Sequence, residues 1–142
     1  MLAITTIVSC KKDSDEDPLV LPTAEQYLTW QIGTTKGEFL VNADTITAAR
    51  TNNLTEILAH SPSNGNSVSM LFTSERTPGT YTTNFTMTIN NETYLPSNEP
   101  VRVTVTQYES ISGYIVGSYQ GELRDDEFKR YGIRGYFKIR TR

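Results

Sequence analysis

Apolar and polar residues alternate along most of this chain, and the pattern is clearest in its last third. Val101, Val103 and Val105 are separated by polar residues. Such a two-residue period is typical of a β-strand with one buried face. The same period predicts a strand over residues 114–124 and a final strand after a charged loop. Their expected inward residues are Ile115, Gly117, Tyr119, Gly121 and Leu123, then Ile133, Gly135, Phe137 and Ile139.

The first two thirds of the chain predict shorter strands. In Tyr27–Ile32 every second residue is apolar, and Trp30 is expected in the core rather than in a binding site. Asn64-Gly65 predicts a tight hairpin turn, because both central positions of that turn need positive φ angles. Further strands are expected over 38–41, 45–50, 55–61, 68–72, 80–83 and 85–89, with a turn over 33–37 and a loop over 90–100.

The number and spacing of these segments define the fold class. No segment has apolar residues at helical spacing, so an all-β domain is expected. About 8–10 short strands with turn signals between them predict an antiparallel β-sandwich. An up-and-down, calycin-like β-barrel is the alternative, because Gly117, Gly121 and Gly135 share the inward face. A missing side chain there lets a strand bend, or lets a large neighbour such as Tyr119 or Phe137 fill the space.

The N-terminal stretch has a different pattern. Residues 2–8 are apolar or small, Ser9 is small, and Cys10 is the only cysteine of the chain. A short apolar run before a small residue and a processing site is typical of the end of a secretory signal peptide. Residues 11–17 are all polar or charged and predict a solvated spacer. We expect the coding start to lie upstream of Met1, since a signal peptide begins with a positively charged region.

Ile7, Val8, Ser9 and Cys10 fill the four positions of a bacterial lipobox, and the segment resembles lipoproteins of the Bacteroidetes type. The resemblance implies that Cys10 is lipidated and becomes the mature N-terminus. It also implies that the acidic run over 11–17 directs the protein to the outer membrane, with exposure at the cell surface. The chain then divides into a signal-peptide remnant (1–9), a lipidated, flexible tether (10–22) and a single all-β domain (23–142).

The C-terminal hairpin carries a second, looser resemblance. Its two strands contain Gly117-Ser118-Tyr119 and Gly135-Tyr136-Phe137. These runs resemble the last hairpin of small, uncharacterised β-sandwich lipoproteins of the same type. The resemblance implies the fold and transfers no catalytic residue.

Length and charge restrict the classes of protein that fit. The chain has 142 residues, enough for one domain with a substantial core. Its formal net charge is −3, and residues 11–17, with two lysines and four acidic residues, contribute −2 of it. The remaining −1 gives no sign of a nucleic-acid partner.

Residues suited to catalysis or metal binding are few. A Ser-His pair would need His60, the only histidine, and the chain has no G-x-S-x-G motif. Zinc is disfavoured because one His and one Cys provide too few ligands. Asp125-Asp126-Glu127 offers carboxylates to calcium but lacks the alternating ligands and glycine of an EF-hand, so a solvated turn is favoured. We expect no enzyme, no cofactor and no metal site.

One set of outward side chains on the last two strands is a candidate binding surface. Tyr114, Arg134, Tyr136, Lys138 and Arg140 all have the outward parity. Aromatic rings stack on sugar faces, while neighbouring cations and donors bind hydroxyl or acid groups. The alternative is an ordinary solvent-facing sheet, in which cross-strand pairs contribute stability.

Together these features predict a non-enzymatic, lipid-anchored protein of the cell envelope, a surface or periplasmic binding or accessory module for a glycan or a protein partner. A β-barrel carrier of a small apolar ligand is the first alternative, and a hydrolase with dispersed carboxylates is the second. Contact with the membrane is expected through the lipid on Cys10.

Lipidation is tested by labelling cells with radioactive palmitate. Cells should incorporate label into the wild-type protein and none into the Cys10→Ala variant, because the cysteine carries the lipid. Protease added to intact cells should then degrade the labelled protein on the outer face. A wild-type protein that stays unlabelled would contradict the anchor.

Overall fold

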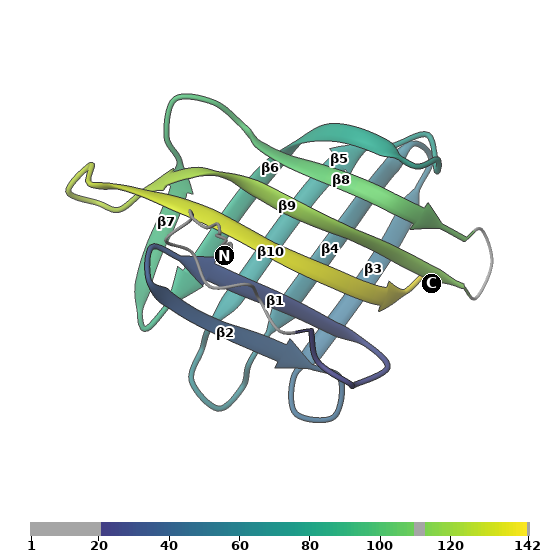
Figure 1. Ribbon diagram of the computed structural model, residues 1–142, viewed down its shortest axis with the longest axis horizontal. Coiled ribbons are helices and arrows are strands. Elements are labelled where there is room, and N and C mark those ends of the chain that lie inside the picture. Colours follow the sequence, from purple (N-terminus) through teal and green to yellow (C-terminus); the bar gives the residue numbers. More distant parts are fainter. Residues whose placement is uncertain (1–20, 110–112, 142) are drawn as a thin grey trace, which may run out of the picture.

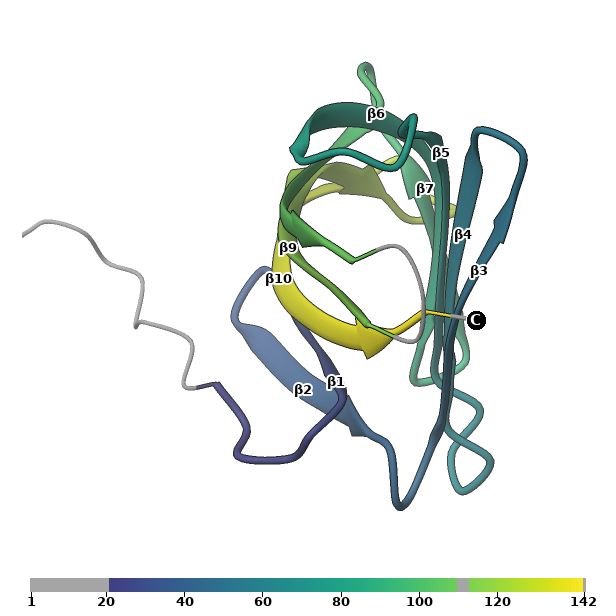
Figure 2. The ribbon, with the colours of Figure 1, turned by 90° about the vertical axis from the view of Figure 1, so that its right-hand side faces the viewer.

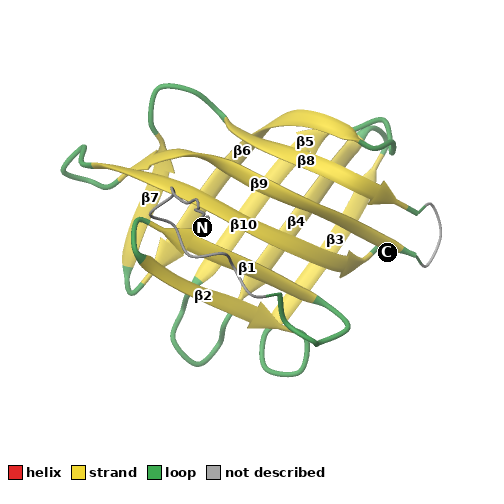
Figure 3. Ribbon diagram, viewed as in Figure 1, coloured by secondary structure: helices red, strands yellow, loops and turns green. Residues whose placement is uncertain are grey.

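Ten β-strands make up the part of the chain that the structure describes, residues 21–109 and 113–141 of a computed structural model. These residues form strands, turns and bends, and Figure 3 shows no helix among them. The predicted all-β class is therefore confirmed. The strands are β1 (Tyr27–Ile32), β2 (Thr35–Leu40), β3 (Thr45–Thr51), β4 (Leu54–His60), β5 (Ser67–Thr73), β6 (Gly79–Ile89), β7 (Glu92–Pro96), β8 (Val101–Tyr108), β9 (Tyr114–Arg124) and β10 (Arg130–Arg140).

The strands form two layers that face each other across the core. Figure 1 shows β2, β1, β10, β9 and β8 in front, with β3, β4 and β5 behind them at a steep angle. Figure 2 shows the same two layers from the side. The paired strands are antiparallel, in the order β2-β1-β10-β9-β7-β6-β5-β4-β3, and β8 pairs with β6 and β9.

Two strands join the layers and close part of the sheet into a small barrel. In β6, residues 84–88 pair with β5 in the back layer, whereas residues 79–83 pair with β8 in the front layer. The short β7 pairs with β6 through residues 92–94 and with β9 through Leu95 and Pro96. The structure thus combines the sandwich and barrel features that the sequence left open.

The predicted inward faces form the core. Val101, Val103 and Val105 are each at most 2% exposed, and Trp30 is 5% exposed, as expected of core residues. Because successive side chains of a strand point to opposite faces, the polar residues between them line the outer surface. The largest fully buried side chains include Leu28, Phe39, Ile57, Met70, Met87, Ile115, Tyr119, Leu123, Phe137 and Ile139.

Two inward glycines of the C-terminal hairpin each lie opposite an aromatic residue. Gly135 pairs with Tyr119, and Gly117 pairs with Phe137. A Cβ atom on Gly135 would lie 2.5 Å from the Tyr119 ring carbon Cζ and 2.1 Å from the carbonyl oxygen of Thr29. A Cβ atom on Gly117 would lie 2.8 Å from the Phe137 ring. The prediction that large neighbours fill the space of these glycines is confirmed.

The β1–β10 ladder is interrupted where Tyr119 reaches it. The register is the same on both sides of the gap, with Leu28 opposite Phe137 and Gln31 opposite Arg134. Within the gap, the Tyr119 hydroxyl donates to the Thr29 carbonyl at 2.7 Å, in a buried position. The Thr29 hydroxyl also accepts from the Tyr136 amide at 2.9 Å. Side chains therefore replace backbone pairing at this point.

The hairpin predicted at Asn64-Gly65 is confirmed, since β4 and β5 pair on either side of residues 61–66, but its turn is longer than expected. The β4–β5 connection spans residues 61–66, and in Asn64-Gly65 only the glycine has a positive φ, 78°. The Asn66 side chain accepts from the Asn90 amide at 2.9 Å, which ties this longer loop to the next turn. That turn, between β6 and β7, has positive φ at Asn90 (53°) and Asn91 (67°). Asn tolerates this conformation because its short side chain can hydrogen-bond locally.

Three other expected boundaries were wrong. The turn predicted over 33–37 is shorter, because β2 begins at Thr35. The pieces predicted over 80–83 and 85–89 are one strand, β6, which passes from one layer to the other. The loop predicted over 90–100 contains β7, whose pairing at the corner of the barrel has no signature in its own sequence.

Arg50 places a charge on the inward face of β3, the last strand of the hydrogen-bonded order. Its guanidinium carbon lies 5.8 Å from the ring centre of Tyr108. Within the described part of the chain, its Nε and Nη1 are buried without a hydrogen-bond partner. An inward-pointing charge on an edge strand discourages pairing with another chain.

Two glycines of β10 provide a matched test of the packing. Gly135→Ala should lower the free energy of unfolding by about 3 kcal/mol, because overpacking against backbone leaves little room for relaxation. Gly132→Ala should change it by less than about 0.5 kcal/mol, since nothing lies within 4 Å of a Cβ at that position. Urea denaturation measures both. Equal effects of the two substitutions would contradict this account.

Candidate functional site

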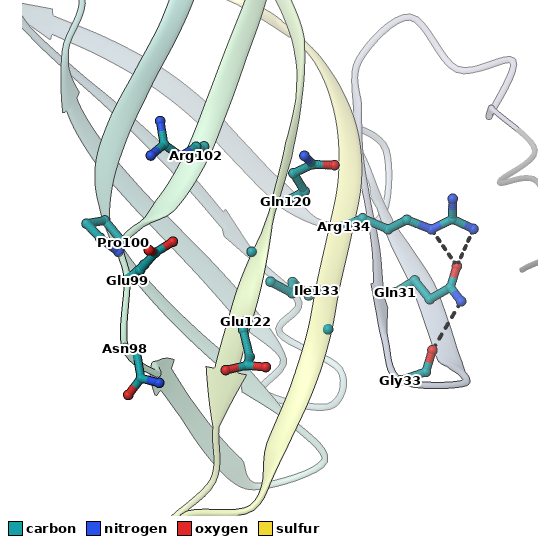
Figure 4. Close-up of a pocket in the computed structure, with 12 residues that line it drawn as sticks. Gln31, Gly33, Asn98, Glu99, Pro100, Arg102, Gln120, Glu122, Ile133 and Arg134 are labelled. Carbon is teal, nitrogen blue, oxygen red and sulfur yellow. Dashed lines mark hydrogen bonds between the residues drawn. The ribbon is translucent and has the colours of Figure 1, made fainter.

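A polar groove lies on the outer face of the front layer, and Figure 4 shows its residues. Its volume is about 820 Å³. The β1–β2 turn at Gly33 borders it on one side, and the segment 98–100 between β7 and β8 borders it on the other. The lining residues are Gln31, Gly33, Asn98, Glu99, Pro100, Arg102, Gln120, Gly121, Glu122, Gly132, Ile133 and Arg134.

Strand register brings the central polar residues of the groove into one row. Gln31 of β1 is opposite Arg134 of β10, Arg134 is opposite Gln120 of β9, and Gln120 is opposite Arg102 of β8. The Arg134 Nε and Nη2 atoms donate to the Gln31 side-chain oxygen at 3.2 and 3.1 Å. The Gln31 amide nitrogen in turn donates to the Gly33 carbonyl at 3.1 Å. These bonds orient Gln31 and Arg134 along the groove.

A glycine leaves the groove open at its floor. Gly132 has the outward parity of β10, where Arg130 and Arg134 are its neighbours on the same face. A Cβ atom at Gly132 would meet nothing within 4 Å. The position opposite is Glu122 of β9, which also lines the groove. A ligand can therefore approach the backbone of β10 closely here.

The groove combines charges of both signs with neutral amides. Glu99 and Glu122 balance Arg102 and Arg134, so these four lining residues have no formal net charge. Arg130 forms an exposed ion pair with Glu122 at 3.8 Å. Carboxylates accept hydrogen bonds, guanidinium groups donate them, and the amides of Gln31, Asn98 and Gln120 do both. Such a set is suited to a ligand rich in hydroxyl or amide groups.

The structure separates the five outward residues that the sequence predicted to form one binding surface. Arg134 lies in the groove. Tyr136, the next outward residue of β10, is 37% exposed and sits opposite Ser118. Lys138 and Arg140 continue along β10 toward its other end, where Arg140 is opposite Tyr114. Only Arg134 and Tyr136 are therefore close to the groove.

At that other end, Tyr114 is surrounded by charges of this chain. The Lys138 Nζ atom lies 4.9 Å and the Arg140 Cζ atom 4.8 Å from its ring centre. Its hydroxyl donates to Glu25, which also pairs with Arg140 Nη2 at 2.5 Å. The hydrogen bonds from Tyr114 and Arg140 lower the pKa of Glu25, and the bond to Glu25 raises the pKa of Tyr114. Intramolecular cation–π contacts thus occupy this ring.

Asp125 organises the β9–β10 turn through its own carboxylate. Its Oδ1 atom accepts from the amides of Glu127 and Lys129, both at 2.9 Å. Its Oδ2 atom accepts from the Tyr131 hydroxyl at 3.2 Å. Burial alone would raise the pKa of Asp125, but these hydrogen bonds outweigh it and hold the pKa below its ordinary value. The carboxylate therefore stabilises the turn, as an Asx-type cap does.

The remaining candidates lie apart from the groove. His60 is exposed at the end of β4. Cys10 lies outside the described residues. The candidate residues chosen from the sequence did not include Gln31, Gln120 or Glu122, which line the groove. The outward parity of Gln120 and Glu122 in β9 was nevertheless evident from the sequence. Their alignment depends on register across four strands, which no local pattern encodes.

Comparison of the chain with protein-family models, with curated proteins and with solved structures gives no match. In the residues described here, no group of three or more His, Cys, Asp or Glu side chains is placed to hold a metal ion. The same residues contain no helix that is long and apolar enough to span a membrane.

The Asp125 carboxylate should make the stability of the fold depend on pH. Because its pKa is lowered in the folded state, it stabilises the fold above the unfolded-state pKa, and this contribution is lost as the pH falls through the folded-state value. Asp125→Asn should therefore lower Tm at pH 7, and its difference from wild type should shrink below about pH 4. Asp126→Asn, an exposed neighbour, should leave Tm nearly unchanged. A Tm difference for Asp125→Asn that stays constant down to pH 2 would contradict the ionic role.

Proposed function

We propose that this chain is a non-enzymatic binding module of the bacterial cell envelope that holds a glycan in its polar groove. The observation that carries the proposal is the row of Gln31, Arg134, Gln120 and Arg102 across four strands. Its donors and acceptors lie on rigid strands rather than on loops, so the binding geometry is set before the ligand arrives.

The chemistry of the groove favours a carbohydrate over a strongly charged ligand. Each sugar hydroxyl both donates and accepts hydrogen bonds, which matches amides and guanidinium groups interspersed with carboxylates. The four charged lining residues cancel formally, so a polyanion gains little net attraction. A volume of about 820 Å³ is also within the usual range of small-molecule sites.

Tyr136 supplies an aromatic surface next to the groove. It follows Arg134 on the outward face of β10, and it is 37% exposed. A sugar that extends beyond the groove along β10 can stack on this ring, while Tyr114 is held by its own cations.

The proposed location rests on the sequence. The lipobox at Ile7–Cys10 and the acidic run over 11–17 support a lipid anchor in the outer membrane, with the domain at the cell surface. A polymer that is bound to one anchored domain meets the next anchored domain at a raised effective concentration. A modest groove on each domain therefore suits the capture of a polymer.

The packed interior gives no support to the alternative of a carrier for an apolar ligand. The space between the layers is filled by large side chains that are at most 2% exposed, among them Phe39, Met70, Tyr119 and Phe137. A protein partner remains the competing occupant of the same outer face, and the experiment below separates it from a glycan.

Blocking the groove tests the proposal. The purified chain should bind a glycan on an array, and Gly132→Trp should reduce that binding at least tenfold, because the indole fills a space that is empty above the backbone. Leu58→Trp on the outer face of β4 is the matched control and should bind normally. Tyr136→Ala should weaken binding by roughly 3- to 10-fold, the value of one stacking contact.

In all three variants the circular dichroism spectrum must be unchanged and Tm must not fall. Absence of binding to any glycan, or binding that is insensitive to Gly132→Trp, would refute the glycan groove. Capture of a defined envelope protein that Gly132→Trp abolishes would assign the groove to a protein partner instead.

A further inference from the structure

The tip of the β9–β10 hairpin presents an aromatic side chain to solvent. Phe128 is 71% exposed, the highest value among the exposed large hydrophobic residues of the described chain. Its φ angle is 64°, in the left-handed region. A bulky residue rarely adopts this conformation, and such outliers concentrate at functional sites.

Hydrogen bonds hold the backbone around Phe128 in place. The Phe128 amide donates to the Asp125 carbonyl at 3.1 Å, and the amides of Glu127 and Lys129 on either side donate to the Asp125 carboxylate. Three successive amides are thus bound to one residue. The exposed position of the ring is therefore a fixed feature of the turn.

One face of the ring is covered by the same chain. The Arg124 Cζ atom lies 4.7 Å from the ring centre of Phe128. This cation–π contact orients the ring. With 71% of the residue exposed, the other face of the ring is available to a flat partner. Leu95, which pairs with Arg124, adds a second exposed apolar side chain at this end of the sheet.

Pairing across the hairpin connects this tip to the groove. Arg124 is opposite Arg130, and Arg130 forms the ion pair with Glu122, which lines the groove. In Figure 1 the β9–β10 turn extends beyond the end of the front layer. A linear ligand that leaves the groove past Glu122 therefore reaches the tip.

We propose that Phe128 is a second stacking platform, which binds a further sugar of the glycan held in the groove. The inference rests on the proposed function and extends the site from the groove to the hairpin tip. Asp125, Asp126 and Glu127 precede Phe128, Lys129 and Arg130 follow it, and Arg124 lies over one ring face. These charges cancel formally, so the tip has no net attraction to an anionic membrane surface. A single free ring face suits the flat face of a pyranose.

Stability and binding should respond in opposite directions to one substitution. Phe128→Gly should raise Tm, because glycine adopts the positive φ without strain and the exposed ring adds no core packing. The same variant should weaken binding of the array glycan with the strongest wild-type signal by roughly 3- to 10-fold. Phe128→Tyr should retain the affinity, whereas Phe128→Leu, which is apolar but not aromatic, should lose it to the same extent as glycine.

The variants distinguish this inference from the groove itself. Loss of binding in Gly132→Trp together with full binding in Phe128→Gly would overturn the platform and leave the groove intact. A glycan that binds both variants as tightly as it binds the wild type, or no bound glycan at all, would overturn both. A lower Tm in Phe128→Gly would show that the ring is structural, and binding of the wild type to anionic vesicles that Phe128→Gly abolishes would assign the tip to the membrane.

Discussion

The buried hydrogen bond from the Tyr119 hydroxyl to the Thr29 carbonyl is the contact on which the front layer depends. It links β9 to β1 across β10, and it is possible only because Gly135 leaves room for the ring. Burial raises the pKa of Tyr119, so the hydroxyl remains a neutral donor at any physiological pH. The ring also contacts Phe85 of the back layer, with 5.5 Å between ring centres. One side chain thus fixes β1 on the sheet and joins the two layers.

The groove is a consequence of that arrangement. Gln31 lies two residues beyond Thr29 on β1, and it is opposite Arg134 because the register survives the gap in the ladder. The far wall is set by the other closure of the barrel, in which β7 pairs with both β6 and β9 and delivers the segment 98–100 to the rim. The groove therefore depends on contacts in the core and at the corner, although most of its lining residues lie outside the core, with Ile133 as the exception.

The sequence predicted those features that a single strand encodes. The alternation in Val101–Tyr108 and Tyr114–Arg124 identified the buried face, because burial of one face imposes a period of two residues. The groove, by contrast, requires the register of four strands and the course of β7, both of which are set by packing over long sequence distances. Likewise, the Asn64-Gly65 pair predicted the β4–β5 hairpin correctly but not the length of its turn, because that loop is also held by a hydrogen bond from the Asn90 amide to the Asn66 side chain. The φ angle of Phe128 has no local signature.

Two positions of the outer surface, Gly132 and Phe128, break local rules without any gain in packing. The inward glycines differ from them. Gly135 and Gly117 weaken their strands, but each is compensated by an aromatic ring that occupies the vacant space. Gly132 has no such neighbour, and Phe128 keeps a bulky side chain in a conformation that suits glycine. Exchanging the two residue types would relieve both costs, since a strand favours a side chain and a positive φ favours glycine. Departures from local preference that the fold does not compensate are typical of functional sites. Gly132 lies beneath the groove and Phe128 lies at the tip of the same hairpin, which is why we propose this end of the front layer as a single binding surface.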